Sequence, residues 1–241
     1  MTPGKHVVVT GAAGGLGTQL VGDLVEHGFT VSALDRHAEG LDRLTSATSG
    51  VTGHVIDVTD SESVAATIES VTALHGPPFG LVNLAGDNRL KPLAELTDAD
   101  WRYLIDANLT SAFYLCRAVM PLMRASGGRV VNTSSIFGLR GADNDAAYAA
   151  AKAGIIGLTR ALATEFAADD ITVNAVAPVV VLTERVRRMP SEHLEGQRAR
   201  IPLGRFSEPA DVTRTICFLL GDGGAFYTGQ TFSPNGGDTM P

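Results

Sequence analysis

The chain has 241 residues, 44% of them hydrophobic, and its 19 lysines and arginines against 26 aspartates and glutamates give a formal net charge of −7. This length suits one α/β domain better than two small ones. An acidic chain without a basic cluster is a poor match for a phosphate backbone, so we expect no nucleic-acid partner.

Membrane insertion, disulfide bonding and metal binding are also disfavoured. No apolar run approaches the length of a membrane span, and the first residues lead into a strand pattern without the apolar region of a signal peptide. Cys116 and Cys217 stand in apolar, helix-like stretches typical of buried thiols. The six histidines lack ligand spacing, which argues against a zinc-dependent alcohol dehydrogenase. We therefore expect a cytoplasmic protein with no membrane partner and no metal site.

In chain order, short β-branched runs alternate with longer helical patterns. The runs predict strands at 5–10, 30–35, 51–58, 79–85, 129–134, 171–177 and 230–233, and the patterns predict helices at 15–27, 61–75, 98–124 and 146–168. Nearly all-apolar strands joined by helices are typical of a parallel sheet covered on both faces. With right-handed crossovers this order predicts an α/β fold, a doubly wound Rossmann-type sheet of about seven strands. No linker or repeat divides residues 1–241, so we expect a single domain.

A glycine-rich turn follows the first strand. Residues 10–17 read Thr-Gly-Ala-Ala-Gly-Gly-Leu-Gly and lead directly into a predicted helix. Glycines there permit a tight turn and let the backbone approach a pyrophosphate at the positive helix N-terminus. A tight turn has a purely structural interpretation too, but its place at the first strand–helix junction favours dinucleotide binding. The candidate contacts are Thr10, Gly11, Gly15, Leu16 and Gly17.

Asp35 ends the second predicted strand, eighteen residues beyond Gly17. A carboxylate there could accept both hydroxyls of an adenosine ribose and would repel a 2′-phosphate, so it favours NAD over NADP as the cofactor. Arg36 follows directly and would favour NADP if it turned inward. The ends of the third and fourth strands supply further candidate contacts at the sheet edge where open α/β sheets bind ligands: Asp57, Val58, Asn83, Ala85 and Gly86.

Tyr148 and Lys152 stand four residues apart on a predicted helix, so their side chains share one face. A nearby lysine ammonium and the positive nicotinamide of an oxidised cofactor would lower the pKa of the phenol from its usual value of about 10. Such a base can take a proton from an alcohol. Ser135 ends the fifth strand and could hydrogen-bond the substrate oxygen. The alternative to a catalytic role for Tyr148 and Lys152 is that they only pack on the helix face. Asn108 lies inside a predicted helix, where a polar residue usually faces solvent.

These motifs together resemble the short-chain dehydrogenase/reductase family over essentially the whole chain. The matching features, in order, are Thr-Gly-x-x-x-Gly-x-Gly at 10–17, Asn-Leu-Ala-Gly at 83–86, Asn108, Ser135, Tyr148-x-x-x-Lys152, Asn-Ala-Val-Ala-Pro at 174–178 and Gly-Gln-Thr-Phe-Ser-Pro-Asn-Gly-Gly at 229–237. The resemblance implies hydride transfer between a nicotinamide ring and an alcohol or ketone.

The resemblance also implies a role for each matching residue. Tyr148 would be the proton donor and acceptor, and Ser135, rather than the neighbouring Ser134, would polarise the carbonyl. Lys152 would hold the nicotinamide ribose and lower the pKa of Tyr148, while Asn108 would anchor a water that links Lys152 to solvent. The implied cofactor contacts include the three glycines that shape the pyrophosphate turn, Asp35 at the unphosphorylated ribose, Pro178 in the motif after the sixth strand, and Thr183 at the carboxamide.

The chain departs from the family pattern at two positions. Leu84 replaces a common asparagine, and Val179 stands where glycine usually follows Pro178. Because a β-branched residue avoids positive φ, the loop that carries Thr183 could run differently. Residues 136–147 and a predicted substrate flap at 182–205 are the expected specificity regions. The flap arginines could bind a phosphate-bearing acyl carrier or form solvated pairs with Glu184, Glu192 and Glu195; they are Arg185, Arg187, Arg188, Arg198, Arg200 and Arg205.

The leading functional hypothesis is an NAD-dependent dehydrogenase of a secondary alcohol. An NADPH-dependent 3-oxoacyl-[acyl-carrier-protein] reductase is the alternative, opposed by Asp35, and a cofactor-sensing regulator without turnover is a third, opposed by the intact tyrosine and lysine. The substrate is a small molecule whose identity the sequence does not give. Predicted helices 98–124 and 146–168 carry apolar residues on more than one face, which, with the resemblance, predicts a homotetramer of 222 symmetry.

Overall fold

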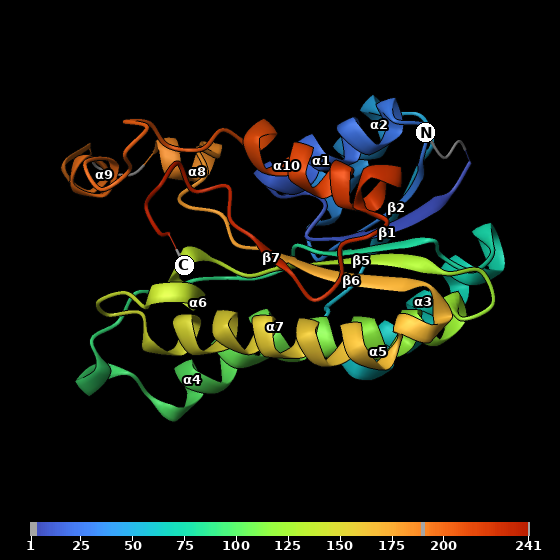
Figure 1. The fold of residues 1–241 in the computed structure, drawn as a ribbon, viewed down its shortest axis with the longest axis horizontal. Helices are drawn as coiled ribbons and strands as arrows, with labels where there is room; N and C mark the ends of the chain where they lie inside the picture. The colour runs from blue at the N-terminus through green and yellow to red at the C-terminus, as the bar shows by residue number, and fades with distance from the viewer. Residues whose placement is uncertain (1–3, 189–190, 241) are drawn as a thin grey trace.

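The computed structural model describes residues 4–188 and 191–240, apart from the side chains of residues 185 and 191–193. Its centre is a seven-stranded parallel sheet with the strand order β3-β2-β1-β4-β5-β6-β7 (Figure 1). The strands are β1 (His6–Thr10), β2 (Thr30–Asp35), β3 (Val51–Val55), β4 (Gly80–Asn83), β5 (Gly128–Thr133), β6 (Ile171–Val176) and β7 (Thr231–Phe232). The prediction of a doubly wound parallel sheet is confirmed. Strand order reverses between β1 and β4, the place where such sheets bind ligands.

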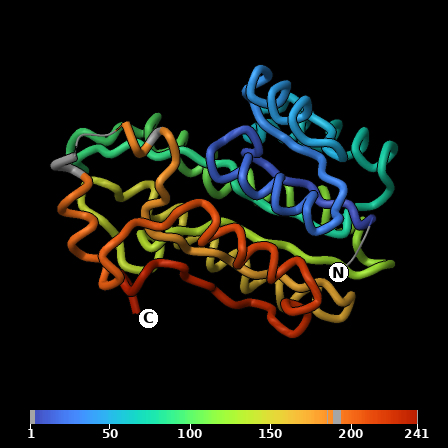
Figure 2. Tube along the Cα trace, turned by 90° about the horizontal axis from the view of Figure 1, so that it is seen from above, coloured from blue at the N-terminus to red at the C-terminus, as the bar shows by residue number. Residues whose placement is uncertain are grey.

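Two layers of helices cover the sheet (Figure 1). One face carries α1 (Gly15–Glu26), α2 (Ala38–Ala47) and α10 (Pro209–Leu220), and the other carries α3 (Ser61–His75), α5 (Ser111–Met123) and α7 (Ala146–Glu165). Seen from above, α10 lies beside α1 although the two are far apart in sequence (Figure 2). The shorter helices α4 (Asp98–Ile105), α6 (Ile136–Arg140), α8 (Glu184–Arg187) and α9 (Ser191–Arg198) gather at one end of the sheet.

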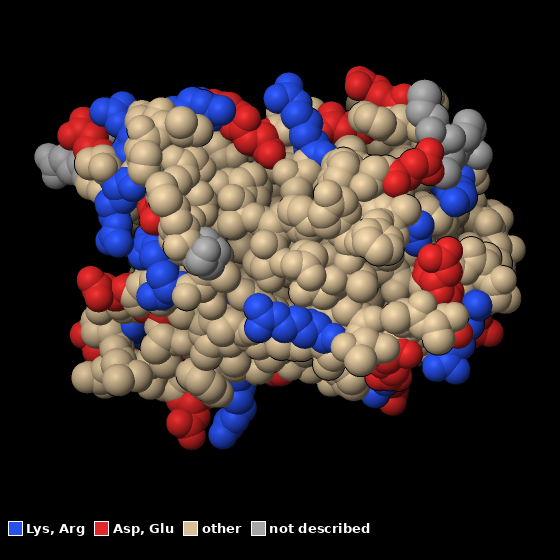
Figure 3. All heavy atoms as spheres, in the orientation of Figure 1, with Lys and Arg blue, Asp and Glu red and all other residues tan. Residues whose placement is uncertain are grey.

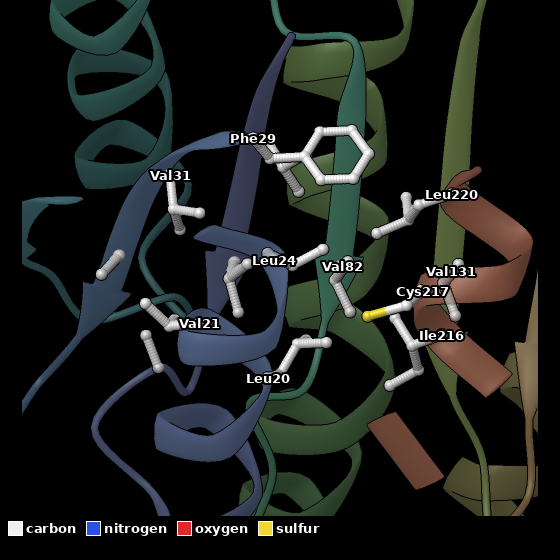
Figure 4. Packing of buried hydrophobic residues seen from close by; sticks show 14 of the residues in the cluster. Leu20, Val21, Leu24, Phe29, Val31, Val82, Val131, Ile216, Cys217 and Leu220 are labelled. Carbon is white, nitrogen blue, oxygen red and sulfur yellow. The ribbon is translucent and has the colours of Figure 1, made fainter. Parts of the chain in front are cut away.

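Each layer has its own apolar core. Under α1 and α10, side chains such as Leu24, Val82 and Ile216 are fully buried (Figure 4). A second core joins α3, α5 and α7 to the opposite face, with Leu115 and Met120 at its centre. Burial of each such side chain contributes about 1.5–3 kcal/mol. The two cores fix the sheet, and the carboxyl ends of the strands are thereby held in place.

The long helix predicted over residues 98–124 is present as a continuous helical segment to Met123, but a π-helical turn divides it. Helix α4 ends at Ile105, a π-helical turn follows at Asp106–Thr110, and α5 begins at Ser111. Wide turns of this kind are rare and often mark functional sites. Helix α6 lies inside the expected specificity region 136–147, where no helix was predicted. Helices α2 and α10 were not predicted either, and several strands are shorter than predicted.

In the described ranges, none of the helices combines the length and hydropathy that crossing a membrane requires.

Candidate active site

The glycine-rich turn is shaped by close contacts that exclude larger residues. Gly11 has φ +66°, a conformation that favours glycine, and a Cβ on Gly17 would lie 2.2 Å from the carbonyl oxygen of Gly11. The Thr10 hydroxyl accepts hydrogen bonds from the backbone N–H groups of Leu84 and Ala85, both at 3.2 Å. These contacts draw the end of β1, the start of α1 and the end of β4 together around one crevice.

A cleft of about 1070 Å³ opens at this crevice. Most of the predicted cofactor contacts line it: Gly11, Gly15, Leu16, Gly17, Asp35, Asp57, Val58, Ala85, Gly86 and Thr183. Asp35 is 8% exposed, and its two oxygens accept the backbone N–H groups of Ala13 at 2.9 Å and His37 at 3.0 Å. The carboxylate is therefore held as a fixed acceptor on the cleft wall.

Asn83 and Pro178 are not among the residues that line this cleft. The Asn83 amide donates to Asn132 Oδ1 at 2.8 Å, and Asn132 in turn donates to the Thr159 hydroxyl at 3.0 Å, so Asn83 belongs to a buried polar chain that ties β4 to β5 and α7. The carbonyl of Pro178 accepts the N–H of Ile136 at 3.2 Å and joins the loop after β6 to the start of α6.

Helix α7 and the end of β5 bring Tyr148, Lys152 and Ser135 together. The Lys152 ammonium lies 5.5 Å from the centre of the Tyr148 ring and donates to the carbonyl of Thr133 at 2.8 Å. The Ser135 hydroxyl is a hydrogen-bond partner of Tyr148, and it also accepts the N–H of Phe137 at 3.1 Å as the N-cap of α6. The Ser134 hydroxyl points elsewhere and donates to the carbonyl of Lys152 at 2.7 Å.

Burial dominates the electrostatics of this group. Burial raises the pKa of Tyr148 to about 12, the hydrogen bond from Ser135 opposes this, and the charges of Asp145 and Asp87 add to it. Burial lowers the pKa of Lys152 to about 8. Lys152 is not among the groups that shift the pKa of Tyr148 in the protein alone, and the prediction that Lys152 and an oxidised nicotinamide together lower this pKa stays a prediction. The ammonium is turned towards the Thr133 carbonyl, and desolvation dominates both residues.

Asn108 lies on the π-helical turn and is only 2% exposed, so the solvent-facing position expected from its helical context is wrong. Its amide donates to the carbonyls of Asp87 at 2.8 Å and Leu104 at 2.9 Å, while its Oδ1 has no hydrogen-bond partner among the described residues. A Cβ on Gly86 would lie 2.5 Å from that oxygen and 3.5 Å from the Lys152 ammonium. The π-helical turn thus aims a buried acceptor at the same backbone position that Lys152 approaches.

The loop after β6 brings Thr183 back to the glycine-rich turn. A Cβ on Gly15 would lie 2.9 Å from the Thr183 Cβ, so the two residues touch across the cleft. Val179 has no positive φ and is 6% exposed, packed with Ile136, Ile201 and Phe206. The valine therefore fits this loop without backbone strain and anchors it to the small apolar core beneath the predicted flap.

Three arginines of segment 182–205 are paired with carboxylates. The observed pairs are Arg187 with Glu208 at 2.7 Å, Arg188 with Glu184, and Arg205 with Asp211 at 2.6 Å. Only Glu184 is among the three partners predicted from the sequence. The side chains of Arg185 and Glu192 lie outside the described residues.

Comparisons with known proteins agree with this geometry. The family described as Enoyl-(Acyl carrier protein) reductase matches residues 11–239. A 3-oxoacyl-[acyl-carrier-protein] reductase FabG of Pseudomonas aeruginosa is 39% identical over 242 residues, 98% of each chain, and that of Thermotoga maritima is 37% identical over 239 residues, 97% of each. A solved structure described as a short-chain dehydrogenase/reductase from Burkholderia xenovorans has a TM-score of 0.92 and 34% identity, over 98% of this chain and 96% of that one.

The chain belongs to the short-chain dehydrogenase/reductase family. It is an NAD(P)-dependent oxidoreductase that acts on a CH–OH or keto group.

In this short-chain dehydrogenase/reductase, the sequence did not indicate Asp87 or Tyr103 at the site, and it indicated Asp145 only as part of the expected specificity region 136–147. Asp87 and Tyr103 line the cleft, and Asp145 lies 2% exposed at the start of α7 beside Tyr148. Asp87 directly follows the Asn-Leu-Ala-Gly motif, which is the one local signal that could have found it. Tyr103 becomes part of the site only through tertiary packing.

Proposed function

We propose that this short-chain dehydrogenase/reductase moves a hydride between NAD(H) and a secondary alcohol or ketone, with Tyr148 as the acid/base. The observation that carries the proposal is the grouping of Tyr148, Ser135 and Lys152 at the carboxyl end of β5. The cleft that holds the glycine-rich turn and Asp35 opens at the same edge of the sheet.

The residues present fit a nicotinamide dinucleotide. Gly11 and Gly17 keep the turn free of side chains, and the Thr183 side chain packs against Gly15 from the opposite wall of the cleft. No side chain in the described part of the chain caps the first turn of α1, which leaves its N–H groups available to a pyrophosphate. The bound nicotinamide would supply the hydride acceptor for oxidation and the hydride donor for reduction.

The protein's own groups would handle the proton. Ser135 would hydrogen-bond the substrate oxygen together with Tyr148, and Tyr148 would take the alcohol proton or return it to the carbonyl oxygen. With a pKa of about 8, Lys152 is mostly charged at neutral pH and would favour the phenolate when its ammonium turns from Thr133 towards the ring. The Oδ1 of Asn108, which has no hydrogen-bond partner among the described residues, would accept a hydrogen bond from a water that passes the proton onward from Lys152.

Asp35 supports NAD as the preferred cofactor, because a carboxylate held on the cleft wall would repel a 2′-phosphate. We expect catalytic efficiency with NAD(H) to exceed that with NADP(H) by about tenfold or more, which is about 1.4 kcal/mol. Asp35→Ala should reduce the ratio of catalytic efficiency with NAD(H) to that with NADP(H). Asp42→Ala, a substitution at an exposed position on α2, should leave this ratio unchanged. Equal or better efficiency of the wild type with NADPH would overturn the NAD assignment.

Reduction of a 3-oxoacyl-[acyl-carrier-protein] with NADPH is a second candidate, supported by the similarity to the two FabG reductases. Under this proposal the segment 182–205 would cover the acyl group. A panel of simple ketones, acetoacetyl-coenzyme A and an acetoacetyl carrier protein, each tried with NADH and NADPH, separates the candidates. Turnover confined to the carrier-bound thioester with NADPH would favour the second, and turnover of free ketones with NADH would favour the first.

The proposal includes a homotetramer of 222 symmetry. Phe113 and Leu122 on α5 are 41% and 36% exposed, and Phe226 near the C-terminus is fully exposed. The face that carries α10, β7 and α7 shows a broad area with few charged side chains, crossed at the level of α7 by one basic side chain (Figure 3). Light scattering at micromolar concentration should give about four times the chain mass of 25.1 kDa, and Phe226→Asp should reduce it. A stable, fully active monomer would overturn the assembly.

A further inference from the structure

Arg36 directly follows Asp35 and lines the cleft, where its side chain is exposed. The hydroxyl of Tyr103, which belongs to α4 on the other side of the cleft, is a hydrogen-bond partner of the Arg36 guanidinium. This hydrogen bond, together with the nearby charges of Asp87 and Asp35, raises the pKa of Arg36. The cation beside the candidate ribose site therefore already has a partner on α4.

Tyr103 is itself held from two directions. Its hydroxyl donates to Asp87 Oδ2 at 2.9 Å, and the guanidinium of Arg89 lies 3.8 Å from the centre of its ring. Arg89 also approaches Asp87, with 3.5 Å between Nε and Oδ2. Because a phenol gives one proton and keeps lone pairs to accept, Tyr103 can donate to Asp87 and accept from Arg36 at the same time. Arg36, Tyr103 and Asp87 thus form a polar chain along the cleft.

This chain bears on which adenosine the cleft accepts. A 2′-phosphate next to Asp35 needs a compensating cation, and an arginine provides the best one because its fork of N–H groups matches phosphate oxygens. Arg36 is the nearest candidate by sequence, but pairing with the phosphate would require it to leave Tyr103. We propose that Tyr103 and Asp87 select against 2′-phosphorylated adenosine by holding Arg36 on the α4 side of the cleft. The proposal rests on the proposed placement of the adenosine ribose at Asp35.

Binding of two nucleotide fragments to the full chain tests this without relying on turnover. Calorimetric titrations with adenosine 2′,5′-bisphosphate and with 5′-AMP would compare the wild type, Tyr103→Phe, Arg36→Ala and the double variant. Tyr103→Phe keeps the ring under Arg89 and removes only the hydroxyl. Tyr114→Phe, on α5 and outside the residues that line the cleft, is the matched control.

We expect Tyr103→Phe to raise affinity for the bisphosphate about tenfold, the effect of one added charge-assisted hydrogen bond, with 5′-AMP unchanged. Arg36→Ala should have little effect in the wild type and should abolish the gain in Tyr103→Phe. Asp87→Asn removes the acceptor charge that holds Tyr103 and should also raise affinity for the bisphosphate in a way that depends on Arg36. This second variant tests the proposal if Tyr103→Phe does not fold.

No gain in either anchor variant, or a gain that survives loss of Arg36, would overturn the proposal. So would a large loss of bisphosphate affinity in Arg36→Ala alone, because Arg36 would then already serve the phosphate. Tighter binding of the bisphosphate than of 5′-AMP by the wild type would contradict the NAD assignment instead. The NAD assignment and the role of Tyr103 can therefore fail separately. The NAD assignment depends on the ratio of bisphosphate to 5′-AMP affinity in the wild type, and the role of Tyr103 depends on how the variants change that ratio.

Discussion

Asp145 stands three residues before Tyr148 at the start of α7. It is 2% exposed, and its negative charge raises the pKa of the Tyr148 phenol. One of its oxygens accepts the Asn88 amide at 3.1 Å, and the other has no hydrogen-bond partner in the described part of the chain. Burial raises the pKa of Asp145 itself, opposed by the Asn88 hydrogen bond. A carboxylate in this position works against formation of the phenolate that alcohol oxidation needs.

Replacement of this carboxylate should change the pH dependence of oxidation. In the wild type, burial raises the pKa of Tyr148 first, and Asp145 adds to that rise. Asp145→Asn keeps the shape and removes the charge, so the rising limb of the oxidation rate should move to lower pH. Profiles of kcat against pH would be compared with those of Asp143→Asn, an exposed control. An unmoved limb would show that Asp145 does not oppose formation of the phenolate.

A second pH effect is expected far from the cleft, at His6. Its ring is 5% exposed, lies 4.8 Å from the ring of His75 and bonds the Ser32 hydroxyl at 2.9 Å. Burial, followed by the charges of His75 and His54, lowers the pKa of His6 from 6.5 to about 4. Because the folded state disfavours the proton, this contribution to stability is full above pH 6.5 and is lost as pH falls towards 4.

The shift of His6 corresponds to a loss on the order of 3 kcal/mol in the free energy of unfolding at the acidic end. His6→Gln retains a side-chain amide for Ser32 and removes the titration, so its stability should fall less between pH 7.5 and pH 4.5. Urea unfolding at both values would be compared with the exposed control His27→Gln. The same acid loss in all three proteins would place the pH sensitivity elsewhere.

Arg140 and Asp238 form a clamp between the end of α6 and the C-terminal segment. The Arg140 Nε lies 2.8 Å from Asp238 Oδ1, and the aspartate side chain is 3% exposed. Removal of one partner leaves a buried charge uncompensated, which typically costs about 3–5 kcal/mol. Arg140→Ala should therefore lower the free energy of unfolding by an amount of that order, and adding Asp238→Asn should restore part of it.

Chemical denaturation would measure the clamp, with Arg43→Ala as the control because Arg43 pairs with Glu39 at an exposed site. Equal effects of Arg140→Ala and Arg43→Ala would show that the clamp contributes no more than an ordinary surface ion pair.

The sheet could be predicted from the sequence because its strands are short apolar runs buried on both faces, as in Val7–Val9 and Val173. The glycine-rich turn and Asp35 were predictable for a related reason: their positions follow from strand ends, which a parallel sheet places at one edge. The predicted end of the third strand was less accurate. Edge strand β3 pairs with β2 alone and is partly exposed, so its apolar pattern does not mark where pairing stops.

The remaining differences depend on contacts between distant segments. The π-helical turn at Asn108 involves a hydrogen bond to the carbonyl of Asp87, which a local helical pattern cannot reveal. The direction of the pKa shift of Tyr148 depends on burial and on the ammonium of Lys152 facing Thr133, both of which arise only in the fold. Val179 departs from the family pattern, yet it fits because the loop does not adopt positive φ there.

The central claim, that Tyr148 transfers the proton, is tested most directly by the turnover of Tyr148→Phe with whichever alcohol or ketone the wild type accepts. We expect kcat to fall by about 10²–10⁴-fold while the affinity for NADH, measured by its fluorescence, stays within about twofold, since the phenylalanine leaves the glycine-rich turn unchanged. Tyr114→Phe should keep wild-type turnover. A Tyr148→Phe enzyme that retains more than about a tenth of the wild-type kcat would contradict the account and move the acid/base role to another group.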